Sequence, residues 1–420
     1  MCSVLEISLL PKQSEIFNDD HRFKIVAAGR RFGKTQLAAY TLALHALQHK
    51  DSIGWIVSPT FPQSMIMWRM IKKIFRDKSL TKYIKGIKEG EKYIELSNGS
   101  TIWAKSGDLP DNLRGEGLEY CIIDEAAMVK EEVWFNVIRP ALADKKGKAI
   151  LISTPKGKNW FYQMFLRGLE DPDYKSFQFT SYENTTIPEE EWEGITKELP
   201  ELIYRQEIMA EFIEGGGVVF RNVDQILTSQ LKDAQAGVSY IMGVDLAKYE
   251  DFTVISVAEV DTRKLVYLHR FNQIDWNYQK DYIKQISQQY NGCICYIDST
   301  GLGDPVAEDL MKNNVPIVPV RITSLSKSQI IQNLQLMIEN KQIELLNDPE
   351  LRKEFGAFAY ELSPSGNLRY GAPSGFHDDI VISIALLAFG LGGLGGATCV
   401  GFYTPMPGEN QSESVWNEEE

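Results

Sequence analysis

Cysteine and histidine are scarce in this sequence of 420 residues, which contains five of each. No two cysteines stand in a Cys-x-x-Cys spacing, and none has a histidine partner at the spacing of zinc ligands. This scarcity argues against a disulfide framework and against a structural zinc site. It favours a reduced, intracellular protein.

The sequence also lacks an N-terminal basic segment followed by an apolar one, so we expect no secretory signal. A long apolar run without charge covers residues 380–400, about the length of a membrane span. Asp378 and Asp379 abut its start, and glycines from Gly390 onward interrupt it after about three helical turns. We therefore expect a buried core helix, a flexible glycine-rich segment after it, and no membrane partner.

Basic residues are fewer than acidic residues over the whole chain, whose net charge is −13. Residues 1–215 hold 29 Lys and Arg against 31 Asp and Glu, a net −2, so the remaining 15 against 26 give −11. Residues 69–92 nevertheless carry nine basic and three acidic side chains, a local +6. This segment either faces a phosphate backbone or forms a solvated helix face.

Short apolar, β-rich runs alternate with helical patterns from Phe23 to about Asn159. Such alternation predicts an α/β fold with a parallel sheet flanked by helices. The pattern stops at three glycines, residues 215–217, which are typical of a linker. We place a first domain at residues 1–214, a linker at 215–236, a second domain at 237–390 and a flexible tail at 391–420.

The second domain begins with three meandering strands, followed by a helix, a strand and further helices. The helices are expected near residues 276–290, 305–313 and 327–340, before the apolar run that closes the domain. This order matches the ribonuclease H arrangement in outline.

The loop AGRRFGKT, from Ala28 to Thr35, follows a predicted strand and opens a predicted helix, as a Walker A loop does. Gly29 and Gly33 let backbone amides turn around phosphate oxygens. Lys34 would reach the terminal phosphates of ATP, and Thr35 would ligate Mg²⁺. The loop departs from the usual pattern because Ala28 replaces the first glycine.

The run YCIIDE is an apolar strand that ends in two carboxylates, the Walker B pattern. Asp124 would hold Mg²⁺ through water, and Glu125 would orient and polarise the attacking water. The alternative is an acidic strand end that caps the next helix. Downstream, Ser153 or Thr154 at the end of LISTP could sense the γ-phosphate and transmit its loss.

Phosphoryl transfer also benefits from an arginine near the γ-phosphate. The candidates are Arg30 and Arg31 within the loop and Arg114 in LPDNLRGEG, although each alone is more often a surface arginine. Gln13 in LLPKQ is a candidate adenine reader, with a surface glutamine as the alternative.

Aspartates in the second domain lie where strands or helices are expected to end or begin. They are Asp245, Asp298 and the pair Asp378 and Asp379. A carboxylate inside an apolar strand is costly unless it is paired or holds a metal, so these positions predict two Mg²⁺ or Mn²⁺ ions. His377 could assist a proton transfer or simply be a satisfied histidine at a helix start. Lys248 and Asp304 are weaker candidates.

Several motifs occur in one chain in a fixed order. They are the Walker A loop with two arginines, a Walker B strand ending in Asp-Glu, STPKGKNWFY, QEIMAEF before the glycine linker, and the GVD, IDSTG and HDDI aspartates. From about Leu9 to Leu387 this order resembles the large terminase subunit of tailed double-stranded DNA bacteriophages. The resemblance implies a P-loop ATPase domain of the ASCE, RecA-like kind and a nuclease domain of the ribonuclease H, RuvC-like kind. It implies an ATP-driven motor that packages viral DNA and an endonuclease that cuts concatemeric DNA.

The family's pattern also implies roles for single residues. Arg30 would sense the γ-phosphate, and Arg114 would act in trans on the ATP of a neighbouring subunit. Asp245, Asp298 and Asp379 would hold the nuclease metals, with Asp378 as an additional ligand.

The partners implied by the resemblance are double-stranded DNA, the portal and procapsid, and the small terminase subunit. On the portal the chain would form a homo-oligomeric ring, five-membered in the family's motors, and alone it could be a monomer. It would act in the host cytoplasm and be absent from the mature virion.

Two alternatives remain open from the sequence. The first is a helicase-nuclease of DNA repair, although only one ATPase core of about 215 residues is visible and a second helicase lobe is not. The second is an ATP-switched DNA-binding protein whose nuclease site is vestigial.

Overall fold

The computed structural model describes residues 8–77, 79–214, 216–247, 251–301, 303–362, 368–373 and 375–394. The chain divides into two compact units. The first comprises Met1–Val223, Ile338–Asn340 and Arg352–Asp378, and the second comprises Asp224–Met337, Lys341–Leu351 and Asp379–Glu420.

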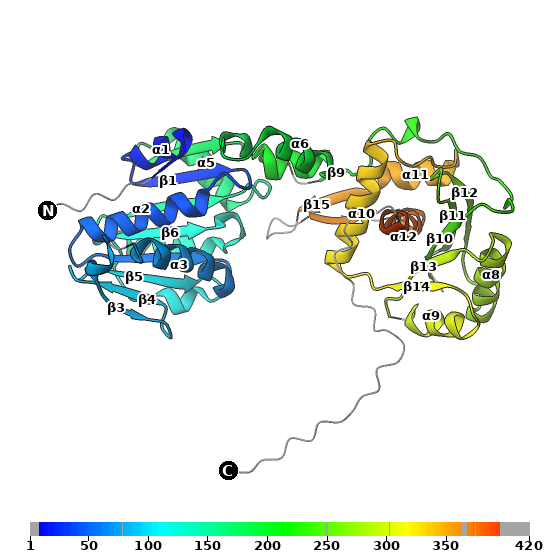
Figure 1. Cartoon of the computed structure of the whole chain (residues 1–420), viewed down its shortest axis with the longest axis horizontal. Helices are drawn as coiled ribbons and strands as arrows, with labels where there is room; N and C mark the ends of the chain where they lie inside the picture. Colours follow the sequence, from blue (N-terminus) through cyan, green and yellow to red (C-terminus); the bar gives the residue numbers. More distant parts are fainter. Residues whose placement is uncertain are drawn as a thin grey trace, which may run out of the picture. The chain divides into compact units, whose positions relative to one another are not determined.

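The first unit is built on an eight-stranded sheet with the strand order β3-β4-β5-β2-β6-β7-β1-β8 (Figure 1). The strands from β5 to β8 are paired in parallel, and β3, β4 and β5 form an antiparallel edge. Their bounds are β1 (Phe23–Ala28), β2 (Ile53–Ser58), β3 (Ile84–Lys88), β4 (Tyr93–Leu96), β5 (Thr101–Ser106), β6 (Tyr120–Asp124), β7 (Lys148–Ser153) and β8 (Tyr174–Phe179).

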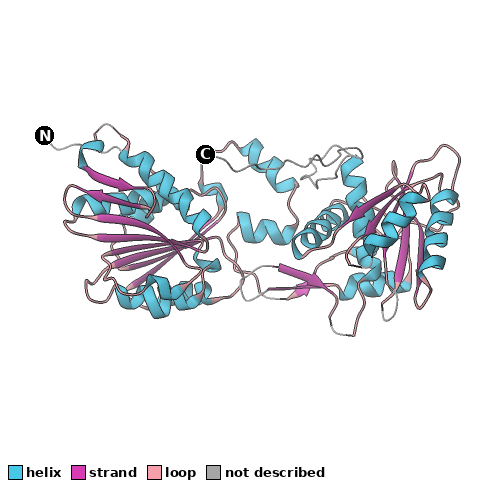
Figure 2. Ribbon diagram, turned by 90° about the horizontal axis from the view of Figure 1, so that it is seen from below, coloured by secondary structure: helices cyan, strands magenta, loops and turns pink. Residues whose placement is uncertain are grey.

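Helices cover both faces of this sheet (Figure 2). Neighbouring strand residues therefore enter opposite cores: Ile122 packs in one hydrophobic cluster and Ile123 in the other. This double burial explains why the central strands are almost uniformly apolar. The helices are α1 (Pro11–Asn18), α2 (Lys34–Gln48), α3 (Phe61–Phe75), α4 (Arg139–Ala141), α5 (Trp160–Glu170), α6 (Glu189–Lys197) and α7 (Glu201–Ile203), with π-helical turns at Val133–Ile138 and Tyr204–Ile208.

A small antiparallel sheet has the order β16-β15-β9. Its strands are β9 (Gly217–Val218), β15 (Ala359–Leu362) and β16 (Leu368–Gly371).

The second unit holds a five-stranded sheet with the order β12-β11-β10-β13-β14. β10, β11 and β12 are antiparallel, whereas β13 and β14 continue in parallel from β10. This is the order that the ribonuclease H arrangement requires. The elements are β10 (Tyr240–Asp245), β11 (Thr253–Glu259), β12 (Leu265–Phe271), α8 (Trp276–Gln289), β13 (Ile294–Asp298), α9 (Gly303–Lys312), β14 (Ile317–Val320), α10 (Ser324–Glu339) and α12 (Asp379–Leu394). Helix α11 (Pro349–Ala357) begins in the second unit, but most of it belongs to the first.

The apolar run at the end of the domain forms α12, a buried helix of 16 residues. The expected break after about three turns is wrong, because the helix continues through Gly390 and Gly392 to Leu394. A Cβ added at Gly390 would lie 2.4 Å from both Ile241 Cδ1 and Tyr296 Cε2, so this glycine permits close packing of the helix on the sheet. Within the described ranges, no helix is long and apolar enough to cross a membrane. The tail predicted after residue 394 lies outside the described residues.

Candidate functional site

The phosphate-binding loop runs from the end of β1 to the start of α2, as its sequence predicts. Gly33 precedes the helix with a φ of 93°, in the region that favours glycine. A Cβ at Gly29 would approach Ser181 Oγ to 2.3 Å and the Ile208 carbonyl oxygen to 2.5 Å, so the backbone passes too close for a side chain.

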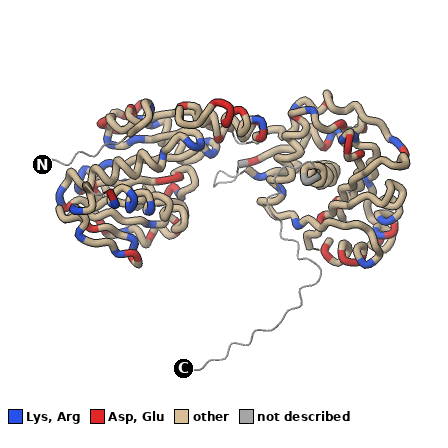
Figure 3. The backbone as a smooth tube through the Cα atoms, in the orientation of Figure 1, with Lys and Arg blue, Asp and Glu red and all other residues tan. Residues whose placement is uncertain are grey.

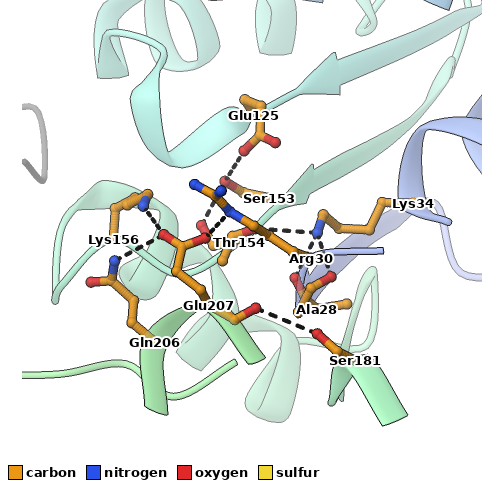
Figure 4. Close-up of polar contacts among 11 residues, drawn as sticks. Ala28, Arg30, Lys34, Glu125, Ser153, Thr154, Lys156, Ser181, Gln206 and Glu207 are labelled. Carbon is orange, nitrogen blue, oxygen red and sulfur yellow. Dashed lines mark hydrogen bonds and ion pairs between the residues drawn. The ribbon is translucent and has the colours of Figure 1, made fainter. Parts of the chain in front are cut away.

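Lys34 lies in the first turn of α2, and its ammonium group is buried over the loop. It donates to the carbonyl oxygens of Ala28 (2.6 Å) and Gly29 (2.9 Å) and to Thr154 Oγ1 (3.2 Å), as Figure 4 shows. Burial lowers the pKa of Lys34 against the raising effect of the nearby carboxylates of Glu125 and Asp124. The buried cation therefore stands where it can meet phosphate oxygens.

Asp124 ends β6 in a buried position, where its carboxylate contacts the Thr35 hydroxyl and accepts the Glu125 amide at 3.1 Å. Burial, reinforced by the charge of Glu125, raises the pKa of Asp124 to about 7. A buried carboxylate next to a hydroxyl is a suitable donor set for Mg²⁺, which would also supply the missing positive charge. The structure thus brings Thr35 and Asp124 together as predicted.

Glu125 directly follows the strand and has a left-handed backbone, with a φ of 50°. Such a conformation is uncommon outside glycine, asparagine and aspartate and is found at functional sites. The Ser153 hydroxyl lies 3.2 Å from Glu125 Oε2 and accepts the Ala127 amide at 3.3 Å. Ser153 therefore connects the end of β7 to Glu125, while Thr154 contacts Lys34 (Figure 4).

Gln13 in α1 is buried, so the surface alternative for this residue is wrong. Its Nε2 donates to the Phe32 carbonyl oxygen at 2.8 Å, and its Oε1 accepts the Leu10 amide at 3.1 Å. Arg31, with a φ of 64°, offers its carbonyl oxygen to Asn184 Nδ2 at 2.6 Å. Both contacts fix the shape of the phosphate-binding loop.

Glu207, which the sequence reasoning missed, is a buried carboxylate at the nucleotide site. Its Oε2 lies 2.5 Å from Arg30 Nε, and its Oε1 pairs with Lys156 Nζ (Figure 4). Its carbonyl oxygen also accepts the Arg30 amide at 2.7 Å. Burial would raise the pKa of Glu207, but the two cations outweigh burial and hold the pKa below its usual value. In the sequence, Glu207 lies in the QEIMAEF segment, and nothing in that segment alone indicates what the residue does.

Arg114 follows the short helical turn Pro110–Leu113 and is exposed, with its Nε 3.0 Å from Asp111 Oδ1. Its contact within the described residues is thus with a neighbouring carboxylate of the same loop.

In the second unit, Asp245 ends β10 and Asp298 ends β13. These strands are parallel neighbours in which Val244 pairs with Ile297, so the two aspartates follow at the same edge of the sheet. Both are half-buried, and Asp298 Oδ1 accepts the Thr300 amide at 2.8 Å.

Asp379 begins α12, is buried, and accepts the Phe252 amide at 3.3 Å. Asp251, His377 and Asp379 each present a ligand atom within 4.8 Å of the others. Carboxylate oxygens with an imidazole suit Mg²⁺ or, better, Mn²⁺. Asp251 was not predicted, because it lies within a turn and not at the end of a strand.

The remaining weaker candidates are less informative. Asp378 is half-buried next to Asp379, and Asp304 is exposed in the first turn of α9. Lys248 lies outside the described residues.

The basic segment 69–92 covers the end of α3 and strand β3 (Figure 3). Lys72 and Lys92 pair with Glu89, and Lys85 pairs with Glu95. These ion pairs neutralise part of the segment, whereas Arg69, Lys73 and Arg76 are exposed on α3 and just after it.

The two units together define a class of protein: a phosphate-binding-loop ATPase joined to a ribonuclease H-like nuclease. Residues 25–224 match the family described as "Terminase large subunit, T4likevirus-type, N-terminal", and residues 242–387 match "Terminase RNaseH-like domain". The terminase large subunit of Thermus virus P23-45 is 31% identical over 418 residues, covering 89% of this chain and 86% of the relative. That of Escherichia phage T5 is 26% identical over 294 residues, covering 66% of each chain.

The chain belongs to the family of phage terminase large subunits. The solved large terminase of the thermophilic bacteriophage D6E has the same fold, with a TM-score of 0.61, 13% identity, and coverage of 91% of this chain and 98% of that one. The chain is thus an ATPase and a metal-dependent nuclease of the DNA-packaging kind, with ATP and divalent metal ions as cofactors. The predicted fold class and family are confirmed, and the two alternative functions are not favoured.

Proposed function

We propose that the first unit hydrolyses ATP to drive double-stranded DNA into a procapsid and that the second unit cuts the DNA with two metal ions. The observation that carries this proposal is that Lys34, Asp124, Glu125 and Ser153 gather around one phosphate-binding loop. The aspartates of the second unit supply the separate cutting site in the same chain.

In the ATPase reaction, Lys34 and the amides of Gly29 and Gly33 hold the phosphates, and Thr35 and Asp124 hold Mg²⁺. The metal ion neutralises charge on the phosphates when it is bound. Glu125 orients the attacking water, because it lies at the tip of the strand that carries Asp124.

Five residues adjust this site. Arg30 leaves Glu207 to contact the γ-phosphate, Arg31 shapes the loop, and Gln13, which is bonded to the Phe32 carbonyl oxygen, reads the adenine. Ser153 and Thr154 connect Glu125 and Lys34 to the end of β7, so they can report loss of the γ-phosphate.

Arg114 acts on the ATP of a neighbouring subunit. Its exposure supports this role, because an arginine that reaches another subunit must project from its own. The chain then works as a ring, of five subunits in this proposal, on the portal of the procapsid, and it is a monomer away from it. The small terminase subunit delivers the DNA, the setting is the host cytoplasm, and the chain is absent from the mature virion.

In the nuclease reaction, Asp245, Asp298 and Asp379 hold two Mg²⁺ or Mn²⁺ ions, with Asp378 as a further ligand. Asp251 joins them because its carboxylate lies near that of Asp379. Two such ions activate water on one side of a phosphodiester and stabilise the leaving oxygen on the other.

Two single substitutions test this division of labour. Glu125→Ala should lower DNA-stimulated ATP turnover by at least about a hundredfold and leave Mn²⁺-dependent cleavage of plasmid DNA measurable. Asp245→Ala should abolish cleavage and leave ATP turnover intact. The exposed residues Glu132 and Asp281 provide matched alanine controls. Cleavage that survives Asp245→Ala would remove the nuclease assignment.

A further inference from the structure

We propose that Gln279 of α8 is a positioning residue of the nuclease. In this proposal it fixes Ala247, which follows β10, and Thr253, which begins β11, so that the carboxylate of Asp251 faces that of Asp379 for metal binding. The inference rests on the proposed nuclease site and adds a residue that contacts neither metal nor DNA.

Gln279 is 1% exposed, and its amide group has all of its donors engaged. Nε2 donates to the carbonyl oxygens of Ala247 (3.0 Å) and Ile274 (2.8 Å). Oε1 lies 2.8 Å from the hydroxyl of Thr253. One buried side chain of α8 therefore holds both stems of the turn, since Ala247 follows β10 and Thr253 begins β11.

Thr253 closes the turn from the other side. Its Oγ1 accepts the Ala247 amide at 2.9 Å and lies 2.9 Å from the Ala247 carbonyl oxygen. Asp245 stands two residues before Ala247, and Asp251 stands two residues before Thr253. The Gln279 network thus lies beside both of these acidic residues in the chain.

Phe252, just before β11, is attached to α12. The amide of Phe252, between Asp251 and Thr253, donates to Asp379 Oδ2 at 3.3 Å. The guanidinium of Arg270 stacks 3.6 Å from the Phe252 ring centroid, with Nη2 3.9 Å from Asp379 Oδ2. The two residues that follow Asp251 in the chain are therefore both anchored, Phe252 to Asp379 and Thr253 to Gln279.

Removing the Gln279 amide takes one hydrogen-bond partner from each of the Ala247 carbonyl, the Ile274 carbonyl and the Thr253 hydroxyl, so Ala247 and Thr253 are held less firmly. Metal binding must then also restrict the position of Asp251, and this cost lowers the metal affinity of the site. Residues that orient metal ligands change metal affinity by about 10- to 100-fold when they are substituted.

The test uses the full chain and measures Mn²⁺ binding by the electron paramagnetic resonance signal of the free ion, without DNA. Binding that Asp245→Ala removes is assigned to the nuclease site. Gln279→Leu and Thr253→Val should each raise the dissociation constant of this site about tenfold. Thr253→Ser, which keeps the hydroxyl, and Gln285→Leu, at an exposed position of α8, should bind Mn²⁺ as the unchanged protein does.

Plasmid cleavage provides the second readout. The Mn²⁺ concentration for half-maximal cleavage should rise about tenfold in Gln279→Leu, with the rate at saturating Mn²⁺ within about threefold of the unchanged protein. Partial unfolding would instead lower the rate at every Mn²⁺ concentration without moving the half-maximal point.

A double substitution separates this inference from the nuclease assignment itself. If Gln279 acts through Asp251, Gln279→Leu should cause no further loss of affinity in an Asp251→Asn background. A full additional loss there, or an unchanged dissociation constant in Gln279→Leu alone, would overturn the role of Gln279. Mn²⁺ binding and cleavage that Asp245→Ala leaves intact would instead reject the nuclease site.

Discussion

Asp124 is a buried carboxylate whose charge Lys34 compensates only in part. Its raised pKa, about 7, means that the folded protein retains a proton that the unfolded chain releases near pH 4. The contribution of Asp124 to stability is therefore most favourable below the unfolded pKa and falls as the pH rises toward 7. Metal binding needs the ionised form, so Mg²⁺ affinity at this site should increase through the same range.

Replacing Asp124 by asparagine should accordingly stabilise the protein when no metal or nucleotide is present. At pH 8 in EDTA the gain in free energy of unfolding should be at most about 4 kcal/mol, and at pH 4 it should nearly vanish. Urea denaturation at the two pH values measures it, and ATP with Mg²⁺ should no longer stabilise the variant. A loss of stability at pH 8 would contradict the assignment of a buried charge.

Glu207 has the opposite electrostatic character, because its pKa is lowered by two cations. Glu207→Gln should lower the free energy of unfolding by about 1 to 3 kcal/mol at pH 7, chiefly by leaving the mostly buried Lys156 unpaired. The contribution of Arg30 is small, since that side chain is 70% exposed.

The pH dependence of the stabilisation by Glu207 follows from the direction of its pKa shift, which is downward. Stabilisation by Glu207 is present above the unfolded pKa of about 4.5 and is lost as the pH falls through the lower folded value. The difference between Glu207→Gln and the unchanged protein should therefore shrink in acid. Glu198→Gln, at an exposed position, should show no such difference at either pH.

At the scale of elements, the sequence predicted the central strands and most helices, because their apolar runs are long and buried. The run from Ile94 to Lys105 reads as one β-rich segment in the sequence, but it forms the antiparallel pair of β4 and β5. Strand β8 was missed because its exposed positions interrupt its apolar pattern.

Site residues at strand ends were predictable for a similar reason. Parallel strands bring their ends together at one edge, so Asp245 and Asp298 could be paired from the sequence. The pairing of Glu207 could not be predicted from the sequence. Its partner Arg30 is 177 residues away, and no local pattern indicates the contact. Asp251 was missed because an aspartate in a turn is usually a turn former.

Two of the glycines within α12, Gly390 and Gly392, give a prediction that separates packing from helix propensity. Gly390→Ala should lower the free energy of unfolding by about 1 to 3 kcal/mol, because the new methyl group would overlap Ile241 and Tyr296. Gly392→Ala should raise it by up to about 1 kcal/mol, because the nearest atom, Asn333 Oδ1, lies at 3.6 Å and alanine favours a helix. Urea denaturation measures the free energy of unfolding of both variants. Equal changes in the two would mean that overlap with Ile241 and Tyr296 does not determine the effect of Gly390→Ala.

At the scale of the whole molecule, the acidic excess belongs to the C-terminal half, so net charge says little about DNA binding by the first unit. What connects subunits in the proposed ring is Arg114. Its side chain is exposed and pairs only loosely with the exposed Asp111, so it is free to reach a neighbouring subunit.

Mixing two inactive variants decides whether Arg114 acts within or between subunits. Lys34→Ala cannot hold ATP phosphates, and Arg114→Ala cannot assist hydrolysis, so each alone should show almost no ATP turnover with procapsids and DNA. In mixed rings at equal amounts, about one interface in four combines an intact Lys34 with an intact Arg114 from the adjacent subunit. Turnover should therefore recover to about a quarter of the unchanged rate if the arginine acts in trans. If it acts in cis, no subunit in any mixture has both groups, and mixing would restore nothing.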